Sequence, residues 1–178
     1  MNIIDSHVHL VQYIAGTGAG GELRSCGNGD AAYASGEVVS QMIPPQFNGD
    51  SVTAEQVLEI MDKNHVEKAV LLQGNYYGFQ NLYTYDAVKR YPDRFQGAAS
   101  YDPFSRKRDH IRKHLFEELG FGIVKFEVST GSGLMSNHPT IPLDGEVMEE
   151  AYSYADEKGQ VFVIDIGKCK SESWQVEA

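Results

Sequence analysis

The chain has 178 residues, and its 15 Lys and Arg against 25 Asp and Glu give a formal net charge of −10. Hydrophobic residues make up 42% of it, enough for one packed domain, which argues against a disordered chain. The acidic balance argues against a nucleic-acid surface, and no apolar run approaches the roughly 20 residues that span a bilayer. The first residues, MNIIDSHVHL, lack the pattern of a signal peptide, so we expect a cytoplasmic protein with free thiols at Cys26 and Cys169.

Short apolar segments rich in β-branched residues alternate with amphipathic segments along most of the chain. They predict, in order, a strand at 3–10, a helix at 53–64, a strand at 68–73, a helix at 80–91, a strand at 95–101, a helix at 105–119, a strand at 122–129, a helix at 145–159 and a strand at 161–167. Thr53 and Gln56 form the pattern of a capping box at the start of the first helix. This alternation is typical of βα units, so the sequence predicts an α/β fold with a parallel sheet.

Residues 11–52 interrupt this alternation directly after the first strand. The segment is rich in Gly, Ser, Asn and Pro and shows no clear period, so we expect a long loop insertion there. Excursions of that length are usually functional lids or poorly ordered segments.

Two further motifs are interpreted as structural. Gly16, Gly18 and Gly21 spell G-x-G-x-x-G, but no helix follows them, which favours a flexible loop over a dinucleotide site. His110 and His114 have i, i+4 spacing on a helix that should lie outside the sheet, which favours solvated side chains over metal ligands.

The strongest chemical signal lies in the first strand. Alternation along a strand puts Asp5, His7 and His9 on one face, at the end where parallel α/β folds place their sites. Imidazoles about 7 Å apart along a strand can converge on one ion, and neutral imidazole suits zinc. The alternative is a pair of histidines whose hydrogen bonds are satisfied by neighbouring polar groups. We favour a metal site formed by His7 and His9.

Residues 3–10, with the sequence IIDSHVHL, resemble the first strand of the amidohydrolase superfamily, whose barrels open with an aspartate and an H-x-H metal pair. TatD-like nucleases and PHP phosphoesterases begin in a similar way. Residues 61–103, with the sequence MDKNHVEKAVLLQGNYYGFQNLYTYDAVKRYPDRFQGAASYDP, resemble the amidohydrolase-related family (amidohydrolase 2), which includes lactonases and decarboxylases. This second stretch disfavours phosphoester hydrolysis.

The resemblance implies a (β/α)8 TIM barrel, a fold that typically takes roughly 250 residues. We therefore expect residues 1–178 to form a single partial TIM-barrel domain with about the first five βα units. The resemblance also implies a metal-dependent hydrolase that cleaves a lactone or amide in a small anionic or cyclic substrate. Non-oxidative decarboxylation is the alternative reaction. A catalytically inactive truncated barrel or half-barrel subunit is the alternative of another class, and its unpaired edges would favour homo-oligomers.

Residues after the second predicted strand are candidates for substrate binding, because barrels place their active-site loops there. Gln73, Tyr76, Tyr77 and Asn81 supply hydrogen-bonding groups and flat apolar faces that suit a small cyclic acid. The alternative is a surface loop whose tyrosines only pack.

The fourth and fifth predicted strands supply the remaining candidates. Lys125, Glu127 and Ser129 share one face of a buried strand, where polar side chains are costly unless paired. Lys125 is a candidate catalytic residue that binds a substrate carboxylate or pairs with Glu127, itself a candidate for substrate binding. Asp165 stands where many family members have a histidine ligand. It is a second catalytic candidate that could bind a divalent metal, for which we expect zinc, and metal-free catalysis is the alternative.

Overall fold

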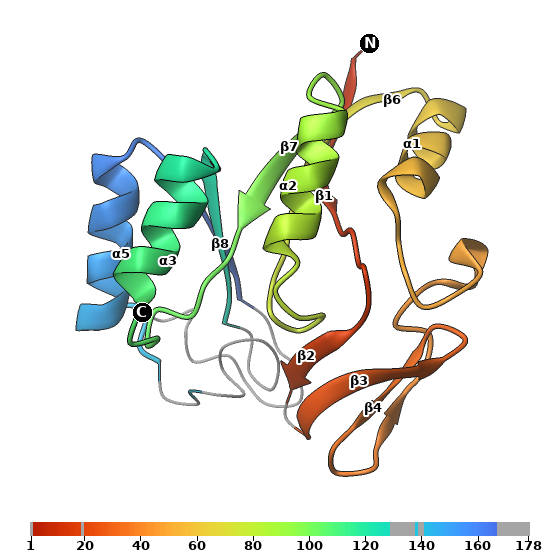
Figure 1. The fold of residues 1–178 in the computed structure, drawn as a ribbon, viewed down its shortest axis with the longest axis horizontal. Coiled ribbons are helices and arrows are strands. Elements are labelled where there is room, and N and C mark those ends of the chain that lie inside the picture. Colours follow the sequence, from red (N-terminus) through yellow and green to blue (C-terminus); the bar gives the residue numbers. More distant parts are fainter. Residues whose placement is uncertain (1, 19, 129–137, 139–140, 167–178) are drawn as a thin grey trace.

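The computed structural model of the chain (Figure 1) describes residues 2–18, 20–128, 138 and 141–166. Five parallel strands form one sheet in the order β1 (Ile3–Val8), β6 (Val66–Leu71), β7 (Phe95–Ala99), β8 (Ile123–Glu127) and β9 (Val161–Asp165). The predicted strand residues Ser129 and Gly167, and the thiol of Cys169, lie outside the described residues. Within this sheet each strand pairs in parallel with the next strand of the same sheet along the chain, as in a TIM barrel. The α/β fold is therefore an incomplete TIM barrel.

Helices follow the strands as the periodicity predicts. They are α1 (Ala54–Lys63), α2 (Asn81–Arg90), α3 (Arg108–Arg112) with its π-helical continuation η2 (Lys113–Glu118), and α5 (Glu146–Glu157). The apolar sides of α1 and α5 are buried, as the positions of Val57, Met61 and Met148 require. Within the part of the chain that the structure describes, no helix is long and apolar enough to cross a membrane.

The prediction of a loop over residues 11–52 is wrong. The segment contains a four-stranded antiparallel sheet of β2 (Ala15–Gly18), β3 (Gly21–Gly27), β4 (Asp30–Tyr33) and β5 (Val38–Val39), followed by the short 3-10 helix η1 (Pro45–Phe47). Asn28 and Gly29 both have positive φ between β3 and β4, which is the Asn-Gly hairpin turn. Three of the four strands have four residues or fewer, and the seven-residue β3 contains two glycines and little apolar alternation, so the sheet does not stand out from the turns that join its strands.

The inserted sheet is bound to the loop that leaves β6. The backbone N–H of Ala15 donates to the carbonyl of Tyr77 at 3.0 Å, and that of Thr17 donates to the carbonyl of Asn75 at 3.2 Å. A Cβ at Gly16 would collide with the backbone of the same loop, so this glycine of the G-x-G pattern permits close packing. The insertion therefore holds the loop that carries the predicted substrate residues (Figure 1).

The two edge strands of the parallel sheet, β1 and β9, expose apolar side chains. Ile3 and Ile4 of β1 and Val161 of β9 are among the exposed large hydrophobic residues. Unpaired strand edges with apolar side chains are templates for pairing with another chain. Self-association through these edges stays a prediction.

The capping box of α1 is present and links this helix to the insertion. Thr53 Oγ1 accepts the Gln56 N–H at 3.2 Å, Gln56 Oε1 accepts the Thr53 N–H at 2.9 Å, and Gln56 Nε2 donates to the Phe47 carbonyl at 2.9 Å. We expect Thr53→Ala to lower the free energy of unfolding by about 1 kcal/mol, because a helix donor loses its acceptor. Urea unfolding measures this change. Thr53→Ser retains the hydroxyl and is the control, and equal stability of the two variants would contradict the role of the cap.

Candidate active site

The candidate residues gather where the parallel strands end. His7 and His9 lie at the end of β1, Gln73 follows β6, Lys125 and Glu127 belong to β8, and Asp165 ends β9. Because these strands are parallel, their carboxyl ends meet at one edge of the sheet. This is the edge at which TIM barrels build their active sites.

The two histidines of β1 converge. Their Nε2 atoms are 3.1 Å apart and their ring centroids 4.9 Å apart. The His9 ring also packs against the ring of Tyr77, with centroids 5.4 Å apart. Asp5 plays a local part, because its Oδ1 accepts the backbone N–H of His7 at 3.0 Å.

His9 is held in its neutral form. The pKa of His9 is lowered to about 4, mainly by burial, and the electrostatic effects of Lys125 and His7 act in the same direction. The ring of His9 is therefore uncharged at pH 7 and offers a nitrogen lone pair, as a metal ligand or a base requires.

The histidine pair fits a divalent ion in its donor chemistry. Two ligands that bind one zinc ion at 2.0–2.1 Å in a tetrahedral arrangement stand about 3.3 Å apart, close to the 3.1 Å of the two Nε2 atoms. Among the described residues, no group of three or more His, Cys, Asp or Glu side chains could hold a metal ion. Because a catalytic zinc site takes three protein ligands, the pair supplies part of such a site.

Lys125 forms an ion pair with Asp165 rather than the predicted pair with Glu127. Its side chain is 1% exposed, and its Nζ lies 3.3 Å from Asp165 Oδ2. In the register of β8 and β9, Glu127 lies opposite Asp165, which places Lys125 two residues before that pair. Lys125 is buried while the Asp165 side chain is 37% exposed, so removal of Asp165 would leave an interior ammonium group without this partner, whereas removal of Lys125 would leave a carboxylate that water can reach.

Glu127 is buried next to the loop after β6. Its Oε2 accepts the backbone N–H of Tyr76 at 2.8 Å, and a Cβ at Gly74 would collide with its carboxylate. Burial raises the pKa of Glu127 and the negative charge of Asp165 raises it too, against the opposing effects of Tyr76 and Lys125. A carboxyl group with a raised pKa is suited to proton transfer near neutral pH.

Gln73 is buried with an unused amide. Its side chain is 1% exposed, and neither Oε1 nor Nε2 has a hydrogen-bond partner among the described residues. A buried polar group without a partner costs about 1–3 kcal/mol. An amide in this condition, directly after a strand that ends at the site, is a candidate for binding a ligand.

Asn81 is placed differently from the other candidates. Its Nδ2 donates to the carbonyl of Ser100 at 2.8 Å, and its Oδ1 accepts the N–H of Ser100 at 2.9 Å. Both ends of the amide thus bind α2 to the residue that follows β7. Tyr76 contacts the insertion, because the hydroxyls of Tyr76 and Tyr33 lie 3.3 Å apart.

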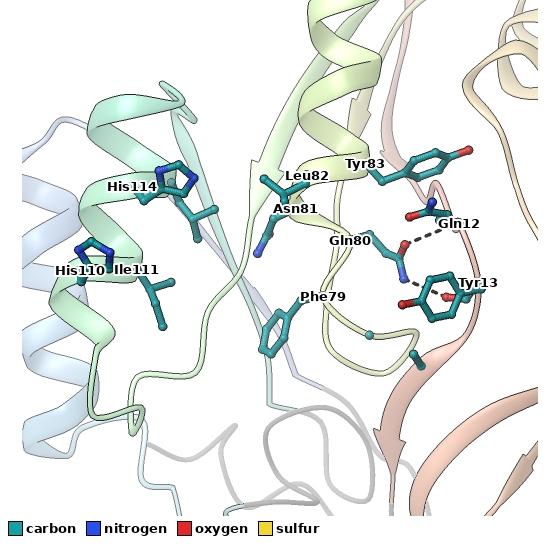
Figure 2. A pocket seen from close by; sticks show the side chains of 13 residues that line it. Gln12, Tyr13, Phe79, Gln80, Asn81, Leu82, Tyr83, His110, Ile111 and His114 are labelled. Atoms are coloured by element: carbon teal, nitrogen blue, oxygen red, sulfur yellow. Dashed lines mark hydrogen bonds between the residues drawn. The ribbon is translucent and has the colours of Figure 1, made fainter.

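Asn81 lines a cavity of about 510 Å³ between α2 and α3, shown in Figure 2. Gln80 closes one side of it, with its Oε1 accepting the N–H of Gln12 at 3.1 Å and its Nε2 donating to the Tyr13 carbonyl at 3.0 Å. His110 and His114 line the opposite side. His114 Nδ1 lies 2.8 Å from Glu118 Oε2 of the same helical segment, a local pair.

Two features of this edge were missed by the sequence reasoning. A cavity of about 420 Å³ opens beside His7 and His9, and the insertion forms one of its walls. The second feature is the contact between His138 and Asp102, with Nε2 and Oδ2 3.2 Å apart. The apolar residues Met42, Ile43 and Phe47 were the available signal for the cavity, but they lie in a segment that composition marks as a loop.

No family model matches the chain, and none of the curated proteins matches it. Solved structures do resemble it. A protein described as a probable 2-pyrone-4,6-dicarboxylic acid hydrolase from Acinetobacter baumannii, solved with citric acid bound, aligns with 92% of this chain and 49% of its own, at 16% identity and a TM-score of 0.58. A structure described as amidohydrolase II aligns with 99% of this chain and 54% of its own, at 15% identity and a TM-score of 0.53.

An uncharacterised TIM-barrel protein from Bordetella bronchiseptica aligns with 62% of this chain and 38% of its own, at 21% identity and a TM-score of 0.50. The chain thus spans about half the length, or less, of the solved structures that it resembles. At these identities the likeness concerns the fold, and it agrees with the order of the parallel strands.

Zinc binding tests the histidine pair. We expect the chain to bind one zinc ion, and His7→Ala or His9→Ala to weaken binding by about tenfold or more, since each removes one of two ligands. Isothermal titration calorimetry with zinc chloride measures the affinity. His110→Ala is the control at an exposed histidine, and equal zinc affinity in all four proteins would contradict the site.

The lowered pKa of His9 predicts a pH dependence of stability in chelator-treated protein. Because this pKa of about 4 lies below the value of 6.5 in the unfolded chain, the contribution of the neutral ring is fully present above pH 6.5 and is lost as the pH falls to 4. The loss should amount to about 2–3 kcal/mol. Urea unfolding at pH 7 and pH 4 measures it. His9→Gln should flatten the dependence and His110→Gln should not, and a slope unchanged in His9→Gln would refute the shift.

Proposed function

We propose that this chain carries the catalytic centre of a hydrolase of the amidohydrolase type that opens a small cyclic ester, a lactone. The observation that carries the proposal is the close pair of His7 and His9 at the edge where Glu127 and the Lys125–Asp165 ion pair also lie. A close imidazole pair can hold a metal ion, a buried carboxyl group with a raised pKa can move a proton, and an unused amide can orient a substrate, which together suit acyl transfer to water.

The fold comparisons support this class of reaction. Both the 2-pyrone-4,6-dicarboxylic acid hydrolase and the amidohydrolase II structure carry names of hydrolases, and a 2-pyrone is a cyclic ester. Fold likeness alone does not carry a reaction from one chain to another, because one fold hosts many chemistries. The proposal therefore depends on the side chains.

His7 and His9 would hold a divalent metal ion. Such an ion polarises a carbonyl or lowers the pKa of a bound water. Gln73 donates a hydrogen bond to the substrate through its Nε2 atom, which satisfies an amide that otherwise lacks a partner among the described residues.

Glu127 acts as the proton acceptor and donor. Its carboxylate takes a proton from the water that attacks the carbonyl carbon, and returns this proton to the ring oxygen when the carbon–oxygen bond of the ring breaks. The raised pKa of Glu127 suits both halves of this transfer. The Tyr76 N–H, 2.8 Å from Oε2, keeps the carboxyl group in position.

The charged side chains of the described site are largely paired with each other. Lys125 lies 3.3 Å from Asp165, and Glu127 adds a second carboxyl group. A substrate carboxylate would therefore depend on the metal ion for a positive partner, whereas an uncharged lactone needs only a polarised carbonyl. We therefore choose neutral lactones as the first substrates to test.

Gln73→Leu tests the proposed site through two opposite effects. We expect the free energy of unfolding of the variant to be about 1 kcal/mol higher, because an unpaired buried amide is removed. Hydrolysis of δ-hexalactone should fall by about tenfold or more, because the substrate loses a hydrogen bond. Urea unfolding and a pH-stat assay measure the two effects.

Gln160→Leu is the matched control, since Gln160 has a buried side-chain oxygen without a partner among the described residues and lies directly before β9, at the opposite end of the strands. It should keep the lactonase rate. A chain that hydrolyses no lactone with zinc present, or a Gln73→Leu variant with the full rate, would overturn the proposed function.

A further inference from the structure

The cavity beside the histidine pair has a mainly apolar lining. Its volume is about 420 Å³, within the range of roughly 300–1,000 Å³ that is usual for small-molecule sites. Most of its lining is apolar, and it shares His7, His9 and Tyr77 with the candidate active site. The other lining residues are Val8, Val11, Gln41, Met42, Ile43, Pro44, Phe47, Val52 and Val57.

The cavity is formed by parts of the chain that hold each other in place. Val52 exchanges two backbone hydrogen bonds with Val11, at 2.8 and 3.0 Å, which binds the end of the insertion to the residues that follow β1. The carbonyl of Phe47 accepts Gln56 Nε2 from α1. Met42, Ile43, Val52 and Val57 are each at most 8% exposed. These walls are ordered without a ligand, so an occupant would not have to order them on binding.

The described lining contains no Lys, Arg, Asp or Glu side chain. The hydroxyl of Tyr77 lies 3.5 Å from the Met42 carbonyl, so it already has a partner. A charged or strongly polar group that entered this cavity would lose its hydration and find few partners. An alkyl or aryl group would instead gain contact with apolar walls, so the occupant that fits is uncharged and apolar.

We propose that this cavity binds an apolar arm of the substrate, an alkyl or aryl substituent on a cyclic ester whose carbonyl lies at His7 and His9. The inference rests on the proposed function, because it names the substrate class of the same site. His7, His9 and Tyr77 border both the cavity and the candidate active site, so one substrate can place its ring at the histidines and its arm in the cavity. The insertion, through Met42, Ile43 and Phe47, then selects substrates by the length of this arm.

A homologous series of lactones tests the inference. δ-Hexalactone, δ-octalactone and δ-decalactone have the same ester ring and carry methyl, propyl and pentyl arms. Because burial of one methylene is worth about 0.8 kcal/mol, we expect kcat/KM to rise about fourfold per added methylene until the cavity is full. The matching 3-alkylcyclohexanones, in which a methylene replaces the ring oxygen, cannot be hydrolysed, and their dissociation constants, measured by calorimetry, should fall by a similar factor.

Phe47→Trp narrows the cavity at a partly exposed position. We expect this variant to lose most of the increase in kcat/KM that the longer arms give. Phe79→Trp is the matched control, because Phe79 lines the cavity between α2 and α3 instead (Figure 2). It should keep the full gain. Circular dichroism is the measurement that checks whether both variants are folded.

The outcomes separate the inference from the proposed function. Hydrolysis with no dependence on arm length, or a gain that survives Phe47→Trp, would overturn the inference and leave the lactonase in place. Cyclohexanones that bind more tightly with longer arms, in a chain that hydrolyses no lactone, would support the cavity and remove the proposed reaction. A chain that neither binds nor hydrolyses any member of the series would overturn both.

Discussion

The ion pair between the buried Lys125 and the partly exposed Asp165 is the interaction on which the candidate site depends. It joins the last two described strands of the sheet at the edge where the other site residues lie. Removal of Asp165 would leave the buried Lys125 ammonium group without this partner. The pair also influences its neighbours, because Lys125 contributes to the lowered pKa of His9 and Asp165 contributes, after burial, to the raised pKa of Glu127.

The insertion after β1 gives the site its second component. Its sheet binds the loop that leaves β6, and its final turns cover the space beside the histidines. Candidate catalytic groups on the ends of strands are thereby combined with a cavity wall from a segment outside the βα pattern. TIM barrels commonly divide these tasks in this way, with the sheet holding the reacting groups and the loops setting specificity.

The local parts of the fold could be predicted from the sequence because they depend on neighbouring residues. The capping box of Thr53 and Gln56 and the apolar side of α1 follow from short-range spacing. The strand alternation brought His7 and His9 to one side, and their nitrogens do meet. The inserted sheet was missed because its strands are short and its stability comes from packing, as the buried Leu23 and Ala31 indicate.

By itself, the sequence determined the βα order, the histidine pair and the presence of polar residues at the ends of the later strands, since each follows from period and position. Only the tertiary structure decided the partners. Lys125 pairs with Asp165 rather than Glu127, and Asn81 binds the backbone of Ser100. These choices depend on the register between strands and on the packing of loops far apart in the chain, which a local pattern of residue types does not specify.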